Sequence, residues 1–373
     1  MAIAIAAARE SAPSDGRVAV TPAVASALVK TGARVLIEAG AGAGAAYTDE
    51  DYIAAGAEVV AAGALLKNAD ILLAVGTPAA ATLKAMRKDQ VLIGLFEAWG
   101  DPKTWDAVTA KGVTVIDLAK LPRQISRAQT MDVLSSQASI AGYRAAIVAA
   151  EAYGRYFPMM VTAAGTAKPA SVLVLGAGVA GLQAIATARR LGSRVTGYDV
   201  RPAAREEVTS LGAQFLTTKV ASADGAGGYA RELTKEEAAE QQRELGEAIA
   251  KFDVVITTAR VPGRKPPLLV TKETVAAMRR GSVVVDLAAG PLGGNVAGVV
   301  QDQRTVTKGG VTLIGAESLA AHMAPAASDA FSKNLAAVVT SLIKDGQIVV
   351  NPEDEVIGAM LVQPARKTEG ANA

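Results

Sequence analysis

A glycine-rich turn near the middle of the chain constrains the fold more than any other feature. It lies in the run VLVLGAGVAGLQAIATARRLGSRVTGYD, residues 172–199, which places glycines at Gly176, Gly178 and Gly181. The apolar residues before the turn predict a buried strand, and the Ala- and Leu-rich residues after it predict a helix. A second apolar strand ends at Asp199, eighteen residues after Gly181. Strand, glycine turn, helix and strand in this order predict a parallel βαβ unit of the Rossmann type.

Each glycine has a physical reason to be where it is if this unit binds a dinucleotide. Gly176 permits a tight turn, Gly178 lets the backbone approach a pyrophosphate, and Gly181 lets the helix pack close to the strand. The helix N-terminus offers N–H groups and the positive end of its dipole to the phosphates. The alternative is a glycine-rich turn in a Rossmann-like domain that binds no nucleotide.

The acid at the end of the second strand indicates which dinucleotide is preferred. Asp199 would accept hydrogen bonds from the adenosine ribose, and its charge would repel a 2′-phosphate, so NAD(H) is favoured over NADP(H). Arg201 could hold a 2′-phosphate, but we expect it to pack beside the adenine.

The composition excludes several classes of function. The 373 residues include 38 Lys and Arg against 36 Asp and Glu, a net charge of +2, which argues against nucleic acid as the main partner. With no cysteine and one histidine, His322, disulfides, thiolate catalysis and multi-histidine metal sites are excluded, and we expect no metal. The first apolar run ends by Ala8 and no window of 18 residues is purely apolar, so we expect neither a signal peptide nor a membrane-spanning helix.

The alternation of apolar strands and helical segments predicts two α/β domains with mostly parallel sheets. We expect a first domain from residues 1–134 and 328–364, completed by a C-terminal helix, and a Rossmann domain from residues 135–327, with the NAD site in the cleft between them. Residues 162–171 predict a turn-rich loop, and residues 365–373 a disordered tail. Strands are expected at residues 2–7, 34–38, 57–60, 71–75, 91–95, 113–117, 171–175, 194–198, 213–216, 253–257, 282–287 and 311–315.

A polar segment at the expected domain boundary is the best candidate for positioning reactants. Residues 122–137 read PRQISRAQTMDVLSSQ and hold Arg123, Arg127, Gln129, Asp132 and Ser135. Oxidation of an alcohol or amine by NAD needs a positioned acid or base, yet the chain shows no obvious His–Asp pair. Hydride transfer between two nicotinamides moves no proton and needs only positioning groups and a close approach. The alternative is a helix N-cap network in which Asp132 pairs with a nearby arginine.

Seven stretches of the chain resemble one family. They are GRVAVTP (16–22), ISRAQTMDVLSSQASIAGYRAA (125–146), FPMMVTAAGTAKPASVLVLGAGVAGLQAIATARRLG (157–192), YDVRP (198–202), GGYARE (227–232), DVVITTA (253–259) and GSVVVDLA (281–288). The chain is similar to the NAD(H)-binding component, the soluble alpha subunit, of proton-translocating NAD(P) transhydrogenase, within the alanine dehydrogenase/PNT superfamily. The block ISRAQ…DVLSSQ…AGY is specific to that family, and the stretches cover most of the chain.

The resemblance implies a role for each site residue. It implies that Arg123 contacts the nicotinamide end of NAD(H), that Gln129 sets the approach of the second nucleotide, and that Asp132 and Ser135 complete a catalytic cluster. It further implies that Gly228 and Tyr229 lie on a mobile loop that closes over the nucleotide. The full set of expected cofactor-binding residues is Arg123, Arg127, Gln129, Gly176, Ala177, Gly178, Val179, Gly181, Asp199, Val200, Arg201, Gly228, Tyr229, Gln241 and Arg260.

The same resemblance implies partners. Relatives pass hydride from NADH to NADP⁺ held on a partner NADP(H)-binding domain, while membrane-spanning subunits translocate protons. This chain would supply only the NADH side, as a homodimer at the inner, cytoplasmic face of the membrane.

Some positions depart from the family pattern and keep two alternatives open. Gln124 is one residue more than the usual PRISRAQ, and Arg260 stands where a leucine near the nucleotide is expected. A divergent, non-catalytic NAD(H) sensor is therefore one alternative. Alanine dehydrogenase is another, but it uses a lysine and a histidine where this chain has Ala74 and the stretch LIGLFEAWG, and Arg17 reads more simply as a structural arginine.

Overall fold

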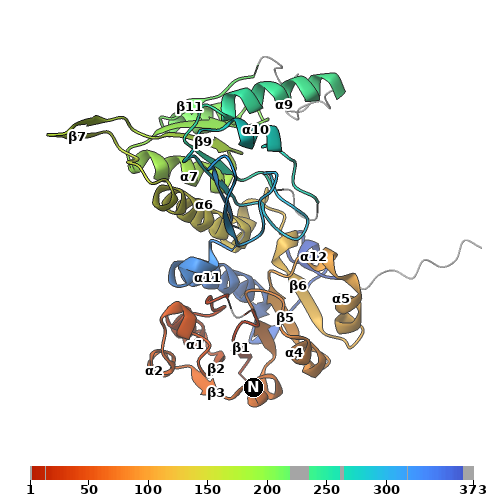
Figure 1. Cartoon of the computed structure of the whole chain (residues 1–373). Coiled ribbons are helices and arrows are strands. Elements are labelled where there is room, and N and C mark those ends of the chain that lie inside the picture. The colour runs from red at the N-terminus through yellow and green to blue at the C-terminus, as the bar shows by residue number, and fades with distance from the viewer. Residues whose placement is uncertain (1, 13, 219–234, 261–263, 317, 364–373) are drawn as a thin grey trace, which may run out of the picture. The chain divides into compact units, whose positions relative to one another are not determined.

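Two compact units make up the protein, seen here as a computed structural model that describes residues 2–12, 14–218, 235–260, 264–316 and 318–363 (Figure 1). The first unit comprises Met1–Gln137 and Ala321–Ala373, and the second comprises Ala138–Ala320. The expected boundaries, after residue 134 and before residue 328, lie three and seven residues from these. The tail expected at residues 365–373 lies outside the described residues.

Gln137 explains why the first unit extends past residue 134. Its Nε2 donates to the Ala327 carbonyl at 3.0 Å, and its Oε1 accepts from the Arg17 guanidinium at 2.9 Å. Because the Gln137 side chain is buried, these hydrogen bonds replace water and join it to both the N-terminal and the C-terminal segments of the first unit.

The first unit is built on a six-stranded sheet of order β3-β2-β1-β4-β5-β6, in which all neighbours are parallel. Parallel neighbours require crossover connections, and helices supply most of them. The elements are β1 (Ala4–Ala7), α1 (Pro22–Lys30), β2 (Arg34–Glu38), α2 (Asp49–Ala54), β3 (Glu58–Val60), α3 (Ala62–Asn68), β4 (Ile71–Leu73), α4 (Ala80–Ala85), β5 (Val91–Gly94), α5 (Pro102–Thr109) and β6 (Thr114–Asp117). The C-terminal segment returns to this unit as α11 (Ala324–Leu342), β16 (Ile343–Lys344), β17 (Gln347–Ile348) and α12 (Ile357–Met360).

Both faces of the first sheet are covered, because side chains alternate between two hydrophobic clusters along each strand. On one face Ile5 belongs to a cluster with Leu28 of α1 and Phe331 of α11. On the other face Leu72 belongs to a cluster with Trp105 of α5. Helix α11 thus supplies core residues to strands that lie about three hundred positions earlier in the chain.

The second unit is built on a seven-stranded sheet of order β11-β10-β9-β12-β13-β15-β14. All neighbours are parallel except β14 and β15. The elements are β9 (Ser171–Leu175), α7 (Val179–Arg190), β10 (Arg194–Tyr198), α8 (Ala204–Ser210), β11 (Gln214–Phe215), α9 (Lys235–Ile249), β12 (Val254–Thr257), α10 (Lys272–Ala277), β13 (Val283–Asp286), β14 (Arg304–Val306) and β15 (Thr312–Gly315), preceded by α6 (Val133–Ala152).

Small residues let the helices of the second unit lie close together and close to the sheet. Val174 of β9 packs in one cluster with Ala149 of α6 and Ile185 of α7. A Cβ at Gly142 of α6 would stand 2.0 Å from the Ala180 carbonyl oxygen of α7, so only glycine permits this approach of the two helices. The parallel α/β fold expected from the sequence is confirmed in both units.

Three features of the fold were not predicted. β14 is an antiparallel edge strand. β16 and β17 form a second small antiparallel pair. The turn-rich loop expected at residues 162–171 is partly wrong: β7 (Met160–Thr162) and β8 (Gly165–Ala167) form an antiparallel hairpin that projects as a thin arm in Figure 1. Gly165, at φ 116°, adopts a backbone conformation that favours glycine and allows the short connection.

Candidate dinucleotide site

The glycine turn between β9 and α7 has the geometry that its sequence predicts. Gly176 has φ 97°, in the region that favours glycine. A Cβ at Gly181 would stand 1.8 Å from the Gly176 carbonyl oxygen, so the first turn of α7 packs directly on the turn. A Cβ at Gly178 would meet nothing within 4 Å, and no side chain caps α7 at Gly178. The space over the helix N-terminus is therefore open, as a pyrophosphate requires. Ala177 and Val179 flank Gly178 in this turn.

Asp199 follows β10 and lies beside this turn. Its carboxylate accepts a hydrogen bond from the Ala177 N–H at 2.7 Å and from the Arg201 N–H at 2.9 Å. The Arg201 guanidinium also donates to it, at 3.0 Å from Nε and 3.2 Å from Nη2. Burial opposes ionisation of Asp199, but the hydrogen bonds from Arg201 and Ala177 outweigh it and hold the pKa of the carboxyl below its ordinary value. Asp199 is thus a carboxylate already oriented by the glycine turn.

A hollow next to Asp199 has the chemistry of an adenosine subsite. The Arg205 guanidinium lies 4.8 Å from the centre of the Phe215 ring and donates to Thr217 Oγ1 at 2.8 Å. Gln241 of α9 lines the same hollow, as expected from the resemblance. The lining residues are Tyr198, Asp199, Val200, Pro202, Arg205, Phe215, Leu216, Thr217, Thr218 and Gln241. Sequence reasoning missed Arg205 and Phe215, because only the fold brings α8 and β11 together.

The polar segment of the first unit forms a second hollow, lined by Arg123, Gln129, Asp132 and Ser135. Arg123 Nε lies 2.9 Å from Asp132 Oδ2, and Arg123 Nη2 donates to Ser135 Oγ at 2.7 Å. The Ser135 N–H and hydroxyl donate to Asp132 at 2.8 and 2.7 Å. Burial opposes ionisation of Asp132, but these bonds from Ser135 and Arg123 hold its pKa below the ordinary value.

The second hollow bears on two expectations from the sequence. The extra residue Gln124 could displace Arg123 relative to Gln129, but both residues line the same hollow. Asp132 also accepts from the backbone of Ser135 at the start of α6, so the N-cap network expected as the alternative is present in the same cluster. The N-cap network thus lies among the residues that line the hollow.

Four expected cofactor-binding residues lie neither in the glycine turn, nor beside Asp199, nor in a hollow that the structure describes. Arg127 does not line the second hollow, because its Nη2 lies 2.6 Å from Asp354 Oδ1 and its Nε 3.5 Å from Glu355 Oε1. Gly228 and Tyr229 lie outside the described residues. Arg260 is exposed in the segment after β12.

Asn295 is another residue that sequence reasoning missed. Its side chain is fully buried and donates to the carbonyls of Ala259 and Pro267 at 2.9 and 2.8 Å, while its Oδ1 accepts from the Ala259 N–H at 3.0 Å. It therefore fixes the segment after β12, whose Thr258 hydroxyl donates to the Gly176 carbonyl at 3.0 Å. A lone asparagine in a glycine-rich stretch gave no signal for this role.

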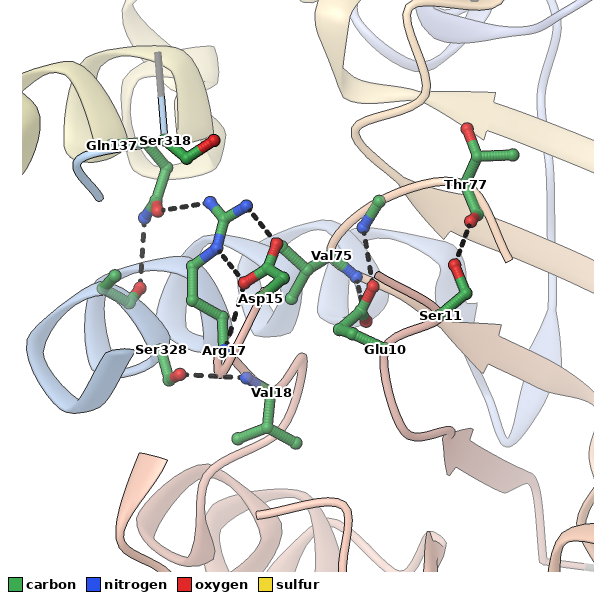
Figure 2. A network of polar contacts seen from close by, with 12 residues as sticks. Glu10, Ser11, Asp15, Arg17, Val18, Val75, Thr77, Gln137, Ser318 and Ser328 are labelled. Atoms are coloured by element: carbon green, nitrogen blue, oxygen red, sulfur yellow. Dashed lines mark hydrogen bonds and ion pairs between the residues drawn. The ribbon is translucent and has the colours of Figure 1, made fainter. Parts of the chain in front are cut away.

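Arg17 lies in a separate network of the first unit, drawn in Figure 2. Its Nε and Nη2 contact the two oxygens of Asp15 at 2.8 and 2.6 Å, and Nη1 donates to Gln137. This arrangement agrees with a structural role. Nearby, Glu10 accepts from the N–H groups of Val75 and Gly76 at 2.7 and 3.0 Å (Figure 2). Desolvation raises the pKa of Glu10 to about 7, although the two backbone N–H groups act in the opposite direction.

Neither a metal site nor a membrane span is found in the portion of the chain that the structure describes. No group of three His, Cys, Asp or Glu side chains there could hold an ion. Within the same residues, no helix combines the length and apolarity needed to cross a bilayer.

Two family descriptions match the chain. "Alanine dehydrogenase/PNT, N-terminal domain" matches residues 6–141, and "Alanine dehydrogenase/PNT, C-terminal domain" matches residues 145–368. The NAD(P) transhydrogenase subunit alpha of Cereibacter sphaeroides is 46% identical over 359 residues, covering 95% of this chain and 68% of the relative. The chain named as the first portion of NAD(P) transhydrogenase subunit alpha in Rickettsia prowazekii is 41% identical over 365 residues, covering 96% of this chain and 94% of the relative.

Solved structures are similar over the whole chain as well. The transhydrogenase from Sinorhizobium meliloti has a TM-score of 0.87 and 42% identity, covering 96% of this chain and 97% of that one. An L-alanine dehydrogenase has a TM-score of 0.80 and 26% identity, covering 97% of this chain and 96% of that one. These transhydrogenase relatives are thus more similar than this dehydrogenase in both sequence and structure.

Proposed function

This chain belongs to the alanine dehydrogenase/PNT family, and we propose that within it the protein is the NAD(H)-binding component, the soluble alpha subunit, of a proton-translocating NAD(P) transhydrogenase. In this proposal it holds NADH while a partner holds NADP⁺. One observation carries the proposal: Arg123, Asp132, Ser135 and Gln129 line one hollow, with ion-pair and hydrogen-bond distances of 2.7–2.9 Å among the first three.

The residues of the second unit fit the dinucleotide. The open space at Gly178 and the uncapped start of α7 suit the pyrophosphate, and Asp199 suits the adenosine ribose. The ionised Asp199 disfavours a 2′-phosphate, which supports NAD(H) on this component. The adenine would lie in the hollow with Val200, Arg205 and Gln241.

The second hollow fits the nicotinamide end. NADH, when bound, supplies the hydride, and the protein has to orient its ring and keep the carboxamide in place. The Arg123 guanidinium offers donors for that purpose, and its contacts with Asp132 and Ser135 fix its orientation. Gln129 at the rim would set the approach of the second nucleotide. No acid or base is required, because the transfer moves no proton.

The contacts of the first unit argue against an amino-acid dehydrogenase. A lysine would be needed where Ala74 is buried, and the Arg17 guanidinium, which could otherwise bind a carboxylate, is engaged by Asp15. The first unit therefore offers an amino-acid substrate neither a lysine as acid or base at this position nor the Arg17 guanidinium as a partner for its carboxylate.

The naming of the Rickettsia prowazekii relative as one portion of a divided alpha subunit supports partner chains. We propose that the protein is a homodimer that docks on an NADP(H)-binding domain and on membrane-spanning subunits at the cytoplasmic face of the membrane. The β7–β8 hairpin supports self-association, because the apolar side chains of Val161 on it and Met159 beside it are 73% and 61% exposed.

One experiment tests the function. The pure protein is titrated with NADH and with NADPH, and then mixed with a purified NADP(H)-binding domain of a transhydrogenase to follow hydride transfer. Preferential NADH binding with transfer supports the proposal. NADH binding without any transfer would instead identify a sensor, and release of ammonia from alanine with NAD would identify a dehydrogenase.

A further inference from the structure

The turn that carries Gln129 is held in place by other residues and not by the Gln129 side chain. This turn is the 3₁₀ helix η4 (Ser126–Met131). Ala128 and Met131 are buried, whereas the Gln129 side chain is exposed and makes no hydrogen bond to any residue described here. The position of Gln129 therefore depends on whatever holds η4.

One contact to η4 comes from a segment more than two hundred residues away. Arg127 Nη2 lies 2.6 Å from Asp354 Oδ1, and Arg127 Nε lies 3.5 Å from Glu355 Oε1. The same Asp354 oxygen accepts from the N–H groups of Val356 and Ile357, each at 2.9 Å. A displacement of Asp354 would therefore break the hydrogen bonds that hold the turn leading into α12.

The electrostatics at Asp354 favour its ionised form in this contact. The Arg127 guanidinium, together with the N–H groups of Ile357 and Val356, lowers the pKa of Asp354 to about 2. Asp354 is therefore ionised at every pH at which the protein would work.

A second contact to η4 comes from α11. Asn334 Nδ2 donates to the Thr130 carbonyl at 2.7 Å, while Asn334 Oδ1 accepts from the Ser136 hydroxyl at 2.8 Å. Ser136 lies in the first turn of α6, immediately after Ser135 of the second hollow. Asn334 thus connects the end of η4 to the helix that carries Ser135.

We propose that Asp354 and Asn334 are positioning residues, which fix η4 from its two ends so that Gln129 stays at the rim of the hollow lined by Arg123, Asp132 and Ser135. This inference rests on the proposed function. Neither residue lines the hollow, so each acts through Gln129 and not on the nucleotide. A displacement of about 1 Å in such a group can slow a transfer about a hundredfold without a matching loss of affinity.

Two isosteric substitutions separate this role from general stability. Asp354→Asn keeps an oxygen for the N–H groups of Val356 and Ile357 but removes the charge that holds Arg127. Asn334→Asp keeps the acceptor for Ser136 but removes the donor to Thr130. Glu58→Gln is the matched control, since it removes an exposed ion pair with Arg34 (2.9 Å) in the same unit without touching η4.

The measurements are hydride transfer with the NADP(H)-binding domain, the NADH dissociation constant, and amide hydrogen exchange over residues 126–131. In each of the two variants we expect transfer about tenfold slower, NADH affinity changed by less than about threefold, and exchange of the turn at least about tenfold faster. Glu58→Gln should leave all three unchanged. Unchanged exchange and transfer in both variants would overturn the proposal, as would a loss of NADH affinity equal to the loss of rate. Absence of transfer in the unmodified protein would refute the proposed function instead, and the exchange measurement would still test the anchoring of η4.

Discussion

Arg201 and Asp199 form an ion pair at the carboxyl end of β10, with 3.0 Å between Nε and Oδ1. The second oxygen of the same carboxylate accepts from the Ala177 N–H of the glycine turn. Asp199, the proposed partner of the ribose, is therefore hydrogen-bonded to the glycine turn, the proposed binding site of the phosphates. The two halves of the dinucleotide site are thus oriented together, before any ligand arrives.

Removing this acid should weaken NADH binding. Asp199→Ala should cost about 1–3 kcal/mol of NADH binding free energy, because charge-assisted hydrogen bonds to the ribose are lost. Equilibrium titration followed by NADH fluorescence measures the effect. Glu207→Ala is the control, since Glu207 lies 3.9 Å from Arg201 and its removal changes the net charge equally without touching the glycine turn. Equal losses in the two variants would contradict the ribose assignment.

Alanine at two glycines of the turn should change the stability of the protein by very different amounts. Gly181→Ala should destabilise the protein by about 3 kcal/mol or more, because the new Cβ would stand 1.8 Å from the Gly176 carbonyl oxygen. Gly178→Ala should change the free energy of unfolding by less than about 1 kcal/mol, because its Cβ meets nothing within 4 Å.

The effect of Gly178→Ala on NADH affinity is a sharper test than its effect on stability. In Gly178→Ala the methyl group would occupy the space left for the pyrophosphate, so NADH affinity should fall at least about tenfold in a protein of nearly normal stability. Denaturant unfolding and NADH titration on the same samples measure both quantities. Normal NADH affinity in Gly178→Ala would contradict a phosphate over this turn.

Gln129 should act on rate more than on affinity. Gln129→Asn shortens the side chain by one methylene and withdraws the amide from the rim of the hollow, so hydride transfer should slow about tenfold or more while NADH binding changes less than about threefold. Stopped-flow transfer and equilibrium titration give the two numbers. Equal losses of rate and affinity would show that Gln129 is an ordinary binding residue.

Glu10 should make stability depend on pH near neutrality. Desolvation raises its pKa from 4.5 to about 7, so between these values the folded protein binds more protons than the unfolded chain. The free energy of unfolding should therefore fall as the pH rises from about 4.5 to about 7. Glu10→Gln should flatten the curve in that window, as denaturant midpoints measured at about pH 4.5, 6 and 7.5 would reveal. A curve of unchanged slope would mean that Glu10 ionises normally.

Local sequence signals predicted the elements of the fold that depend on local physics. β9 and β10 begin and end at the residues expected, because the apolar residues of each strand are bounded by polar or glycine-containing turns. Arg123, Asp132 and Ser135 were grouped for a different local reason, since they belong to one short polar segment.

Contacts between distant segments could not be predicted in this way. Arg127 carries the residue type of a nucleotide ligand, yet its partner Asp354 lies 227 positions away and no local pattern links them. The contact of Arg205 with Phe215 spans only ten positions and was missed for another reason: it depends on how the turn between α8 and β11 returns the chain, which no apolar period predicts. The hairpin of β7 and β8 was not predicted because each strand has only three residues, Met-Val-Thr and Gly-Thr-Ala, which is too short to show an apolar period.

A crystal structure of the protein with NADH would show whether the glycine turn and Asp199 bind the dinucleotide. We expect the pyrophosphate over Gly178 at the start of α7 and the adenosine ribose hydroxyls within hydrogen-bond distance of Asp199. A nucleotide bound elsewhere, or a ribose out of reach of that carboxylate, would contradict this expectation.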